Sequence, residues 1–393
     1  MSNEAFIVSA VRTPVGSFLG AFSDLPAVRL GAAAIKEALA RAGTTGEAVD
    51  EVIMGQVLTA GCGQAPARQA AIHAGLPSSV PCLTINKVCG SGLKAVMLGA
   101  DSIRLGHARV VVAGGQENMT MAPHLLEKSR AGFRMGAVTL IDSMVKDGLW
   151  DPYNDWHMGT AAELCVKENL FTRESQDAFA VESYRRAQAA QAEGRFRAEI
   201  VPVEVPGRKG AVIVDADEEP SKTDFAKVPT LRPAFDPAGT VTAANASKIN
   251  DGAAALVLMG DSAVKAAGAR PLARIIAQAT HAQDPKWFTT APIGAMRKAL
   301  GRAGLDINEI DLFEINAAFA AVTMAAMKEL EIPHARVNVN GGAIALGHPL
   351  GASGARVLAT LVHALEARSL RYGLASLCIG GGEAVAVVIE RMA

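Results

Sequence analysis

Three residues stand out in this sequence because each lies in a glycine-rich segment. Cys89 begins the segment CGSG, His348 lies within GHPLG, and Cys378 begins CIGGG. A thiol next to an imidazole is an activated nucleophile for acyl transfer, and a second thiol can carry a proton. Glycines let a substrate approach the backbone closely, and a run of backbone N–H groups can bind an anion. The three segments therefore suggest acyl chemistry through a cysteine.

Cys89 is the first candidate nucleophile. It follows the strand-like segment Cys82–Val88 and lies at the turn into a helix expected over Leu93–Leu105. Unpaired N–H groups at a helix N-terminus should lower the pKa of this thiol and favour the thiolate. The alternative is a buried structural cysteine, and the residues around Cys89 alone leave both interpretations open.

His348, Cys378 and Asn316 lie in the C-terminal part of the chain. Pro349 fixes the backbone directly after His348, and the flanking glycines permit a tight loop. Asn316 lies where the expected strand IDLFEIN turns into a helix, so its amide could orient a water molecule or polarise a carbonyl. A lone histidine is more often structural than catalytic, and that alternative also stays open.

Two parts of the chain resemble each other at a nearly constant spacing. Residues 35–55 and 296–316 align with an offset of 261, and each predicts an amphipathic helix, a glycine C-cap and an apolar strand. The segments CGSG and GASG lie 262 residues apart, and each opens another helix that leads to a strand. Two matches in the same order predict an internal duplication. If the halves pack around a pseudo-twofold axis, Cys89 of one half faces His348 and Cys378 of the other.

The chain between the duplicated parts has a different character. It contains loops with tryptophan and methionine, a Pro-punctuated acidic segment, and one long helix expected over Arg173–Glu193 with Thr172 as N-cap. We expect an α/β fold, with sheets flanked by helices. We expect an N-terminal half over 1–119 that is rejoined by 250–271, a loop domain over 120–249, and a C-terminal half over 272–393.

The composition of the 393 residues excludes several classes of protein. A net charge of −1 argues against nucleic acid as the main partner. No apolar stretch is long enough to span a membrane, and the N-terminus lacks the pattern of a signal peptide. Five cysteines are few and odd in number, so we expect no disulfide framework and a reducing, cytoplasmic location. No CxxC or HxxxH spacing indicates a metal site, and the low charged fraction of 20% suggests an oligomer.

The motifs together resemble those of the thiolase family, nearly from end to end. The segment NKVCGSGLK at 86–94 is similar to the family's nucleophile motif, GHPLGASG at 347–354 to its histidine motif, and CIGGG at 378–382 to its second cysteine motif. Residues 240–252 resemble the segment where the loop domain of the family rejoins the core. The resemblance implies duplicated halves in five layers, α-β-α-β-α, with a loop domain that shapes a coenzyme A site. It also implies dimers or tetramers, and residues 127–141 resemble the family's tetramerisation loop.

The resemblance also implies a mechanism. Cys89, deprotonated with help from His348, would take the acyl group of an acyl-CoA, and the backbone N–H groups of Cys89 and Gly380 would form an oxyanion hole. Cys378 would then remove a proton from acetyl-CoA, while His348 and a water held by Asn316 would stabilise the enolate. The expected reaction is the reversible condensation of two acetyl-CoA to acetoacetyl-CoA plus CoA, with the CoA thioester as substrate and no further cofactor.

Several alternatives to this function remain. A 3-ketoacyl-CoA thiolase of fatty-acid β-oxidation, with broader chain length, would use the same residues. The segment WFTTAP at 287–292 places bulky rings near the expected acyl pocket and favours the short-chain reaction. A non-catalytic CoA-binding protein would not need the complete residue set, and a cysteine hydrolase would leave Cys378 without a role.

Coenzyme A needs cations for its phosphates and a groove for its uncharged pantetheine. The candidate cations are Arg208, Lys209 and Lys222, although basic residues between glycines are usually part of a solvated loop. By resemblance, the groove is lined by His157, Met158, Ala246, Ser247, Ala318 and Phe319.

The sequence departs from the family pattern at four positions. Ala317 replaces a glutamate next to Asn316, which removes a group that would hold the amide. Glu383 follows the glycine run, and we expect its charge to raise the pKa of Cys378. Lys248 replaces a small residue and adds charge near the CoA entrance. Some members bind potassium through a tyrosine, where this chain has Pro220, so we expect no such site.

Overall fold

Among the described residues, the N-terminal half contributes five long strands and the short β2 to the central sheet. The computed structural model describes residues 4–207 and 210–392, so Arg208 and Lys209, two of the predicted CoA contacts, lie outside the described residues. The strand order is β4-β3-β5-β12-β1, in which β3 runs parallel to both β4 and β5, and β12 runs antiparallel to β5 and β1. The bounds of the five strands are β1 (Ala5–Arg12), β3 (Glu51–Gly55), β4 (Cys82–Ile85), β5 (Val110–Asn118) and β12 (Asn250–Gly260).

The C-terminal half repeats this arrangement. Its strand order is β14-β15-β16-β13, with β14 parallel to β15 and β16 antiparallel to both of its neighbours. The edge strands β1 and β13 pair through Phe6 with Arg274 and Ile7 with Ala273, which joins the halves into one sheet of ten strands. The remaining bounds are β2 (Gly16–Ser17), which pairs with β12, β13 (Ala273–Ala282), β14 (Leu312–Ile315), β15 (Tyr372–Ile379) and β16 (Glu383–Arg391).

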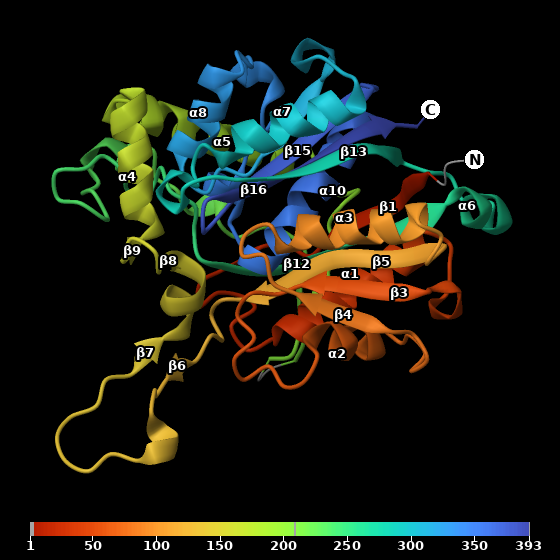
Figure 1. The fold of residues 1–393 in the computed structure, drawn as a ribbon, viewed down its shortest axis with the longest axis horizontal. Coiled ribbons are helices and arrows are strands. Elements are labelled where there is room, and N and C mark those ends of the chain that lie inside the picture. The colour runs from red at the N-terminus through yellow and green to blue at the C-terminus, as the bar shows by residue number, and fades with distance from the viewer. Residues whose placement is uncertain (1–3, 208–209, 393) are drawn as a thin grey trace.

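Helices cover both faces of each half and complete five layers (Figure 1). The middle layer consists of α3 (Ser91–Arg104) and α10 (Leu350–Arg368), which share one core with strands of both halves. The outer helices are α1 (Ala27–Arg41) and α2 (Pro66–His73) on the N-terminal half, and α7 (Ala291–Ala303) and α8 (Ala320–Glu329) on the C-terminal half. A middle helix must be apolar nearly all round, and α10 buries most of its residues.

The duplicated glycines are explained by how closely α3 and α10 approach each other. A Cβ atom added to Gly92 would lie 2.7 Å from the backbone nitrogen of Ala355, and one added to Gly354 would overlap the backbone of Leu93. Side chains at these positions would force the helices apart. The segments CGSG and GASG therefore serve the packing of the middle layer as well as the site at its end.

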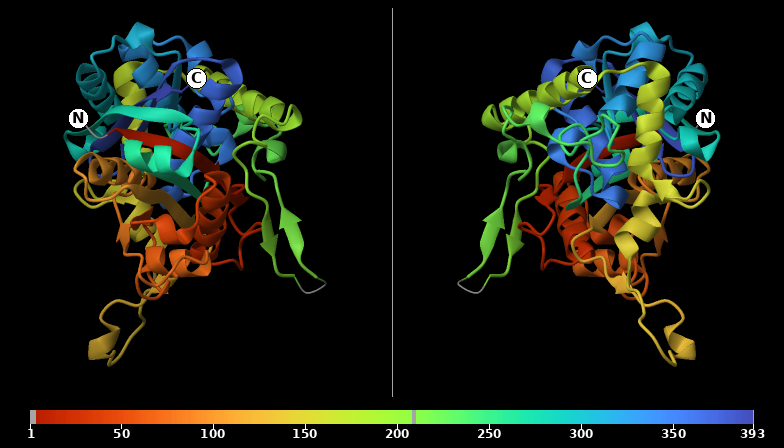
Figure 2. Two further views of the ribbon diagram at one scale, coloured as in Figure 1. Left: turned by 90° about the vertical axis from the view of Figure 1, so that its right-hand side faces the viewer. Right: turned by 90° about the vertical axis from the view of Figure 1, so that its left-hand side faces the viewer.

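The inserted residues form helices and two long projections (Figure 2). Helix α5 spans Arg173–Ala192, and the Thr172 hydroxyl accepts from the N–H of Ser175 at 3.1 Å, which confirms the predicted helix and cap. The strand pairs that project are β6 (His124–Leu125) with β7 (Ile141–Asp142), and β10 (Val203–Val205) with β11 (Val212–Val214). The insertion also contains β8 (Trp150–Asp151), β9 (Trp156–His157) and α4 (Met158–Asn169). The two halves contain the further helices α6 (Asp261–Ala267) and α9 (Ala343–Leu346). Single turns of helix occur along the chain: a π-turn at Val145–Leu149 and 3₁₀ turns at Gly46–Ala48, Ser129–Ala131, Pro220–Lys222, Val228–Thr230, Pro285–Trp287, Ile307–Glu309 and His334–Arg336.

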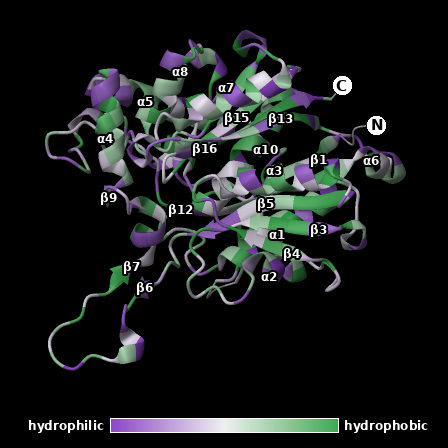
Figure 3. Ribbon diagram, in the orientation of Figure 1, coloured by the Kyte–Doolittle hydropathy of each residue, from purple (hydrophilic) through white to green (hydrophobic). Residues whose placement is uncertain are grey.

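A buried ion-pair cluster fastens the insertion to the N-terminal half. The Arg12 guanidinium, at the end of β1, donates to Glu199 and Asp217 at 2.6 Å each, and all three side chains are buried. Breaking such a buried pair from one side leaves an uncompensated charge. The strands of the central sheet are mostly hydrophobic, as Figure 3 shows. Within the described residues, no helix is long and apolar enough to cross a membrane.

Candidate active site

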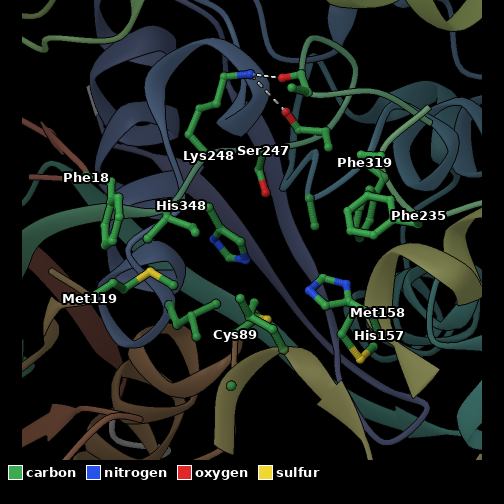
Figure 4. Close-up of a pocket in the computed structure, with 18 of the residues that line it drawn as sticks. Phe18, Cys89, Met119, His157, Met158, Phe235, Ser247, Lys248, Phe319 and His348 are labelled. Carbon is green, nitrogen blue, oxygen red and sulfur yellow. Dashed lines mark hydrogen bonds between the residues drawn. The ribbon is translucent and has the colours of Figure 1, made fainter. Parts of the chain in front are cut away.

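A cavity of about 570 Å³ opens where the ends of α3, β15 and α10 meet the insertion. Figure 4 shows Cys89 and His348 pointing into it from opposite sides, with His157 and Met158 nearby. Gly380 also lines this cavity, whereas Asn316 and Cys378 lie behind its wall. The structure thus brings Cys89 of one half next to His348 and Gly380 of the other.

Cys89 lies on a strained turn between β4 and α3. Val88 adopts a φ of +45°, which is a rare conformation for a β-branched residue. The Ser91 hydroxyl holds the turn, because it accepts from the Lys87 N–H at 2.8 Å and donates to the Val88 carbonyl at 2.7 Å. Gly90 then allows the turn to contact the side chain of Ile379 in the other half. This strained turn places the Cys89 sulfur at the N-terminus of α3, where it lines the cavity.

The pKa of Cys89 corrects a prediction from the sequence. Burial raises the pKa of this thiol to about 11, although the N–H groups of Gly380 and of Cys89 itself donate to the sulfur and favour the thiolate. The helix N-terminus alone predicted a lowered pKa, which is wrong because desolvation outweighs these donors. Cys89 is therefore a thiol at neutral pH and needs a base.

The environment of His348 fixes its tautomer. Its Nδ1 lies 2.6 Å from the hydroxyl oxygen of Ser353, and that hydroxyl donates its proton to the Pro349 carbonyl at 2.8 Å. Because a hydroxyl has one proton, Nδ1 must carry the hydrogen and donate to Ser353. Nε2 then carries no hydrogen and keeps its lone pair, and the Asn316 amide nitrogen lies 3.5 Å from it. Asn250 holds the loop by accepting from the His348 N–H at 2.9 Å.

His348 is also held in its neutral form. Burial, with a smaller contribution from the Arg356 charge, lowers the pKa of the imidazole to about 3. A neutral imidazole with an unprotonated Nε2 is the form that accepts a proton. The pair that faces the cavity is therefore an uncharged thiol and an uncharged base.

Asn316 follows β14 and reaches toward the other side of the imidazole. Its Nδ2 lies 3.5 Å from Nε2 of His348, and its Oδ1 lies 3.5 Å from an Nη2 of Arg356. The neighbouring Ala317 is fully buried and offers no polar group. Among the described residues, Nε and Nη1 of Arg356 have no hydrogen-bond acceptor. The Asn316 amide is thus contacted by Arg356 as well as by His348, and Nη1 of Arg356 lies 3.8 Å from the Glu314 carboxylate.

Cys378 lies at the end of β15 and is 1% exposed. Burial raises the pKa of its thiol well above the usual value, and the charges of Cys89 and Cys165 raise it further. The expected influence of Glu383 is corrected: its carboxylate forms an ion pair with the Lys87 ammonium, and it is not among the groups that shift the pKa of Cys378.

Aromatic rings and small residues form the outer part of the cavity. The His157 ring stacks on Phe235 with centroids 4.7 Å apart, and Phe319 lies edge-on to Phe235 at 6.0 Å and to Phe288 at 6.3 Å. The predicted groove residues all line the cavity, namely His157, Met158, Ala246, Ser247, Ala318 and Phe319, as does Lys222. Phe288 lines it too, but Trp287 lines a separate surface pocket, so only one of the two expected rings faces the site.

Glu117 is fully buried on β5 and was not predicted from the sequence as a residue near the site. Its carboxyl oxygens accept from the N–H groups of Val57 at 3.0 Å, Leu58 at 3.1 Å and Gly351 at 2.7 Å. Burial raises the pKa of Glu117 to about 7, and its charge contributes to the raised pKa of Cys89. The only indication of Glu117 in the sequence was an acidic residue in the segment VVVAGGQEN, which forms the fully buried strand β5. Ser353, Asn250 and Arg356 were also missed, since their roles depend on contacts across the fold.

Within the described ranges, 4–207 and 210–392, no three His, Cys, Asp or Glu side chains gather as potential metal ligands.

Comparison with known proteins places this architecture in a family. The model described as thiolase, N-terminal domain, matches residues 5–262, and the model described as thiolase, C-terminal domain, matches residues 269–391. The chain belongs to the thiolase family, which confirms the resemblance inferred from its motifs.

Individual relatives cover almost the whole chain. Acetyl-CoA acetyltransferase of Cupriavidus necator is 55% identical over 390 residues, and that of Pseudomonas aeruginosa is 54% identical, each with 99% of both chains covered. The crystal structure of Acat5 thiolase from Ascaris suum in complex with coenzyme A has a TM-score of 0.94 at 45% identity, covering 99% of this chain and 100% of that chain. The Bacillus anthracis acetyl-CoA acetyltransferase has a TM-score of 0.97 at 40% identity, covering 100% and 99%. The predicted fold class is confirmed.

Proposed function

We propose that this thiolase is an acetyl-CoA C-acetyltransferase, which condenses two acetyl-CoA to acetoacetyl-CoA and CoA through an acyl-cysteine intermediate. One observation carries the proposal: the Cys89 thiol and the unprotonated Nε2 of His348 face the same cavity, where the Gly380 N–H is directed at the sulfur. The names of the relatives from C. necator and P. aeruginosa support the choice of substrate.

The first half-reaction transfers an acetyl group to the enzyme. Nε2 of His348 takes the thiol proton as the Cys89 sulfur attacks the thioester carbon, and the N–H groups of Cys89 and Gly380 donate to the oxyanion. The carbon–sulfur bond to CoA then breaks, and the departing CoA thiolate takes the proton of Cys378. CoA leaves as a thiol, and the site holds an imidazolium, a Cys378 thiolate and acetyl-Cys89.

The second half-reaction forms the carbon–carbon bond. The Cys378 thiolate removes a proton from the methyl group of a second acetyl-CoA, and its high pKa makes it a strong base for this weakly acidic carbon. The imidazolium of His348, with a water held by Asn316, stabilises the enolate oxygen. The enolate attacks acetyl-Cys89, and the released sulfur takes its proton back from His348. Both cysteines and the histidine return to their neutral forms, and thiolysis follows the same path in reverse.

Coenzyme A is proposed to lie along the outer cavity. Its pantetheine would contact His157, Met158, Ala246, Ser247, Ala318 and Phe319, and Lys222 would lie near its phosphates, with Arg208 and Lys209 as further cations. No cofactor beyond the CoA thioester is needed for the steps above.

The rings of Phe288 and Phe319 support small acyl groups, since they take up space in the cavity that Cys89 lines. Purified enzyme should cleave acetoacetyl-CoA with a kcat/KM at least about tenfold above that for 3-ketooctanoyl-CoA. The reason is that a longer acyl chain would not fit beside these rings, so its burial would add no binding energy in the transition state. Equal values for both substrates would instead identify a thiolase of broad chain length.

We also propose a homotetramer that acts in the cytoplasm in fatty acid metabolism. The loop between β6 and β7 exposes Phe133, Met135, Val138 and Leu140, with Met135 99% exposed, and large exposed apolar groups favour a protein interface. All five cysteines are free, which suits a reducing compartment. We propose the division into 1–119 with 250–271, 120–249, and 272–393. Sedimentation equilibrium of the enzyme would distinguish a tetramer from a dimer.

A further inference from the structure

Lys248 departs from the family pattern, and its half-exposed side chain lines the cavity. The ammonium group donates to the carbonyl oxygen of Ala243 and lies 3.5 Å from that of Ala246, as the dashed lines in Figure 4 show. It also lies 5.8 Å from the centre of the Tyr184 ring. In the part of the chain that the structure describes, no carboxylate forms an ion pair with Lys248. The partners of this cation are therefore two carbonyl dipoles and an aromatic face.

The two carbonyls belong to the turn that forms one wall of the CoA cavity. Thr242, Ala243, Ala246 and Ser247 all line the cavity. The turn is closed by the Ala246 N–H, which donates to the Thr242 carbonyl at 3.1 Å, and the Ser247 N–H donates to the Ala318 carbonyl at 2.8 Å. Whatever holds the carbonyls of this turn in place also sets the shape of the groove.

Carbonyl oxygens that face one point repel one another unless a cation lies between them. Oxygen donors of this kind bind potassium and ammonium ions in proteins. A cation on a side chain is present at a high effective concentration and is not lost by dilution. Tyr184 is 1% exposed on α5, and its ring adds a further attraction for a cation.

We propose that Lys248 is a positioning residue that acts as a built-in monovalent cation: its ammonium neutralises the carbonyls of Ala243 and Ala246 and so holds the turn that shapes the CoA groove. The enzyme therefore works without a free monovalent cation. Removing the side chain leaves a carbonyl site that a small free cation can fill. This inference rests on the proposed function, because CoA is the ligand whose groove the turn shapes.

The test compares the wild type with Lys248→Ala and Lys248→Met in tetramethylammonium chloride and in potassium or ammonium chloride at one ionic strength. Tetramethylammonium is too bulky for the site and keeps the ionic strength constant. In tetramethylammonium, Lys248→Ala should raise KM for acetyl-CoA about tenfold with little change in kcat, which is the loss expected for a charge-assisted hydrogen bond at a half-exposed site. Potassium or ammonium should return KM of Lys248→Ala to within about threefold of the wild type. Lys248→Met should stay impaired, because its side chain still fills the site.

The controls separate this inference from the function on which it rests. CoA binding measured by calorimetry should follow the same cation dependence, so the cation effect can be seen without turnover. Lys298→Ala removes an exposed lysine on α7 and should behave as wild type in every salt. A wild type that itself needs potassium would overturn the proposal, as would a Lys248→Ala variant with wild-type KM in tetramethylammonium. A raised KM that no cation lowers would show that Lys248 binds a CoA phosphate instead. A wild type without condensation activity, but with cation-dependent CoA binding in Lys248→Ala, would refute only the proposed reaction.

Discussion

Ser353→Ala tests whether the hydroxyl on α10 fixes the tautomer of the catalytic histidine. In the wild type, Nδ1–H of His348 donates to Ser353 at 2.6 Å in a fully buried site, and this leaves Nε2 free to take the Cys89 proton. Without the hydroxyl, the Nδ1–H tautomer carries an unpaired buried donor, which costs about 1–3 kcal/mol. A factor of ten corresponds to about 1.4 kcal/mol, so acylation of Cys89 should slow about 5- to 150-fold.

The assay is single-turnover acylation of the enzyme by acetyl-CoA, combined with KM from the steady state. Ser353 does not line the cavity, so KM should stay nearly unchanged while the acylation rate falls. Ser9→Ala is the matched control, because the buried Ser9 hydroxyl donates to the Ala38 carbonyl at 2.7 Å far from the site. It should lose similar stability and keep full activity. A Ser353→Ala enzyme that is acylated within about twofold of the wild-type rate would refute the tautomer argument.

Three further predictions concern stability. Arg12→Met should destabilise the fold by about 3–5 kcal/mol in urea unfolding, because it leaves Glu199 and Asp217 buried without their cation; a loss below about 1 kcal/mol would contradict the role of this cluster as an anchor. The pKa of His348 is near 6.5 in the unfolded chain and about 3 in the folded protein. The contribution of His348 to the free energy of unfolding is therefore present above pH 6.5 and is lost as the pH falls, by up to about 1.4 kcal/mol per pH unit. Urea unfolding at pH 7 and pH 5 should therefore show a steeper acid loss in wild type than in His348→Gln, and parallel losses would count against a neutral buried imidazole. A double-mutant cycle of Lys87→Ala and Glu383→Ala should give a coupling of only about 0.2–1 kcal/mol, because both side chains are partly exposed; a coupling of several kcal/mol would mean that this pair locks the two halves together.

Local patterns in the sequence were enough to predict the helices and the motifs at their ends. The helix with its Thr172 cap was predicted to within one residue, since capping and periodicity are local. The duplicated glycine segments indicated that two related helices open at the site, and the order of strands in the two halves agrees with that duplication.

Properties that arise from packing could not be predicted. The sign of the Cys89 pKa shift was wrong because the helix N-terminus is visible in the sequence, whereas the burial that outweighs it is not. Ser353 appeared as one small residue among many in an apolar helix, and only the position of Nδ1 of His348 reveals its role. Lys248 appeared as a charge for the CoA entrance, and only the fold turns its ammonium toward the carbonyls of Ala243 and Ala246.

The proposed reaction requires that the acetyl group passes through Cys89. Acid quenching of the enzyme shortly after mixing with acetyl-CoA, followed by peptide mass mapping, tests it directly. One acetyl group is expected on the peptide that contains Cys89, with none on Cys378 and no labelling of Cys89→Ala. In Cys378→Ala the acetyl group should appear on Cys89 more slowly, because the proton donor to the departing CoA is missing, and should then persist, because the enolate that removes it cannot form. An acetyl group on another residue, or labelled Cys89→Ala enzyme, would contradict the account.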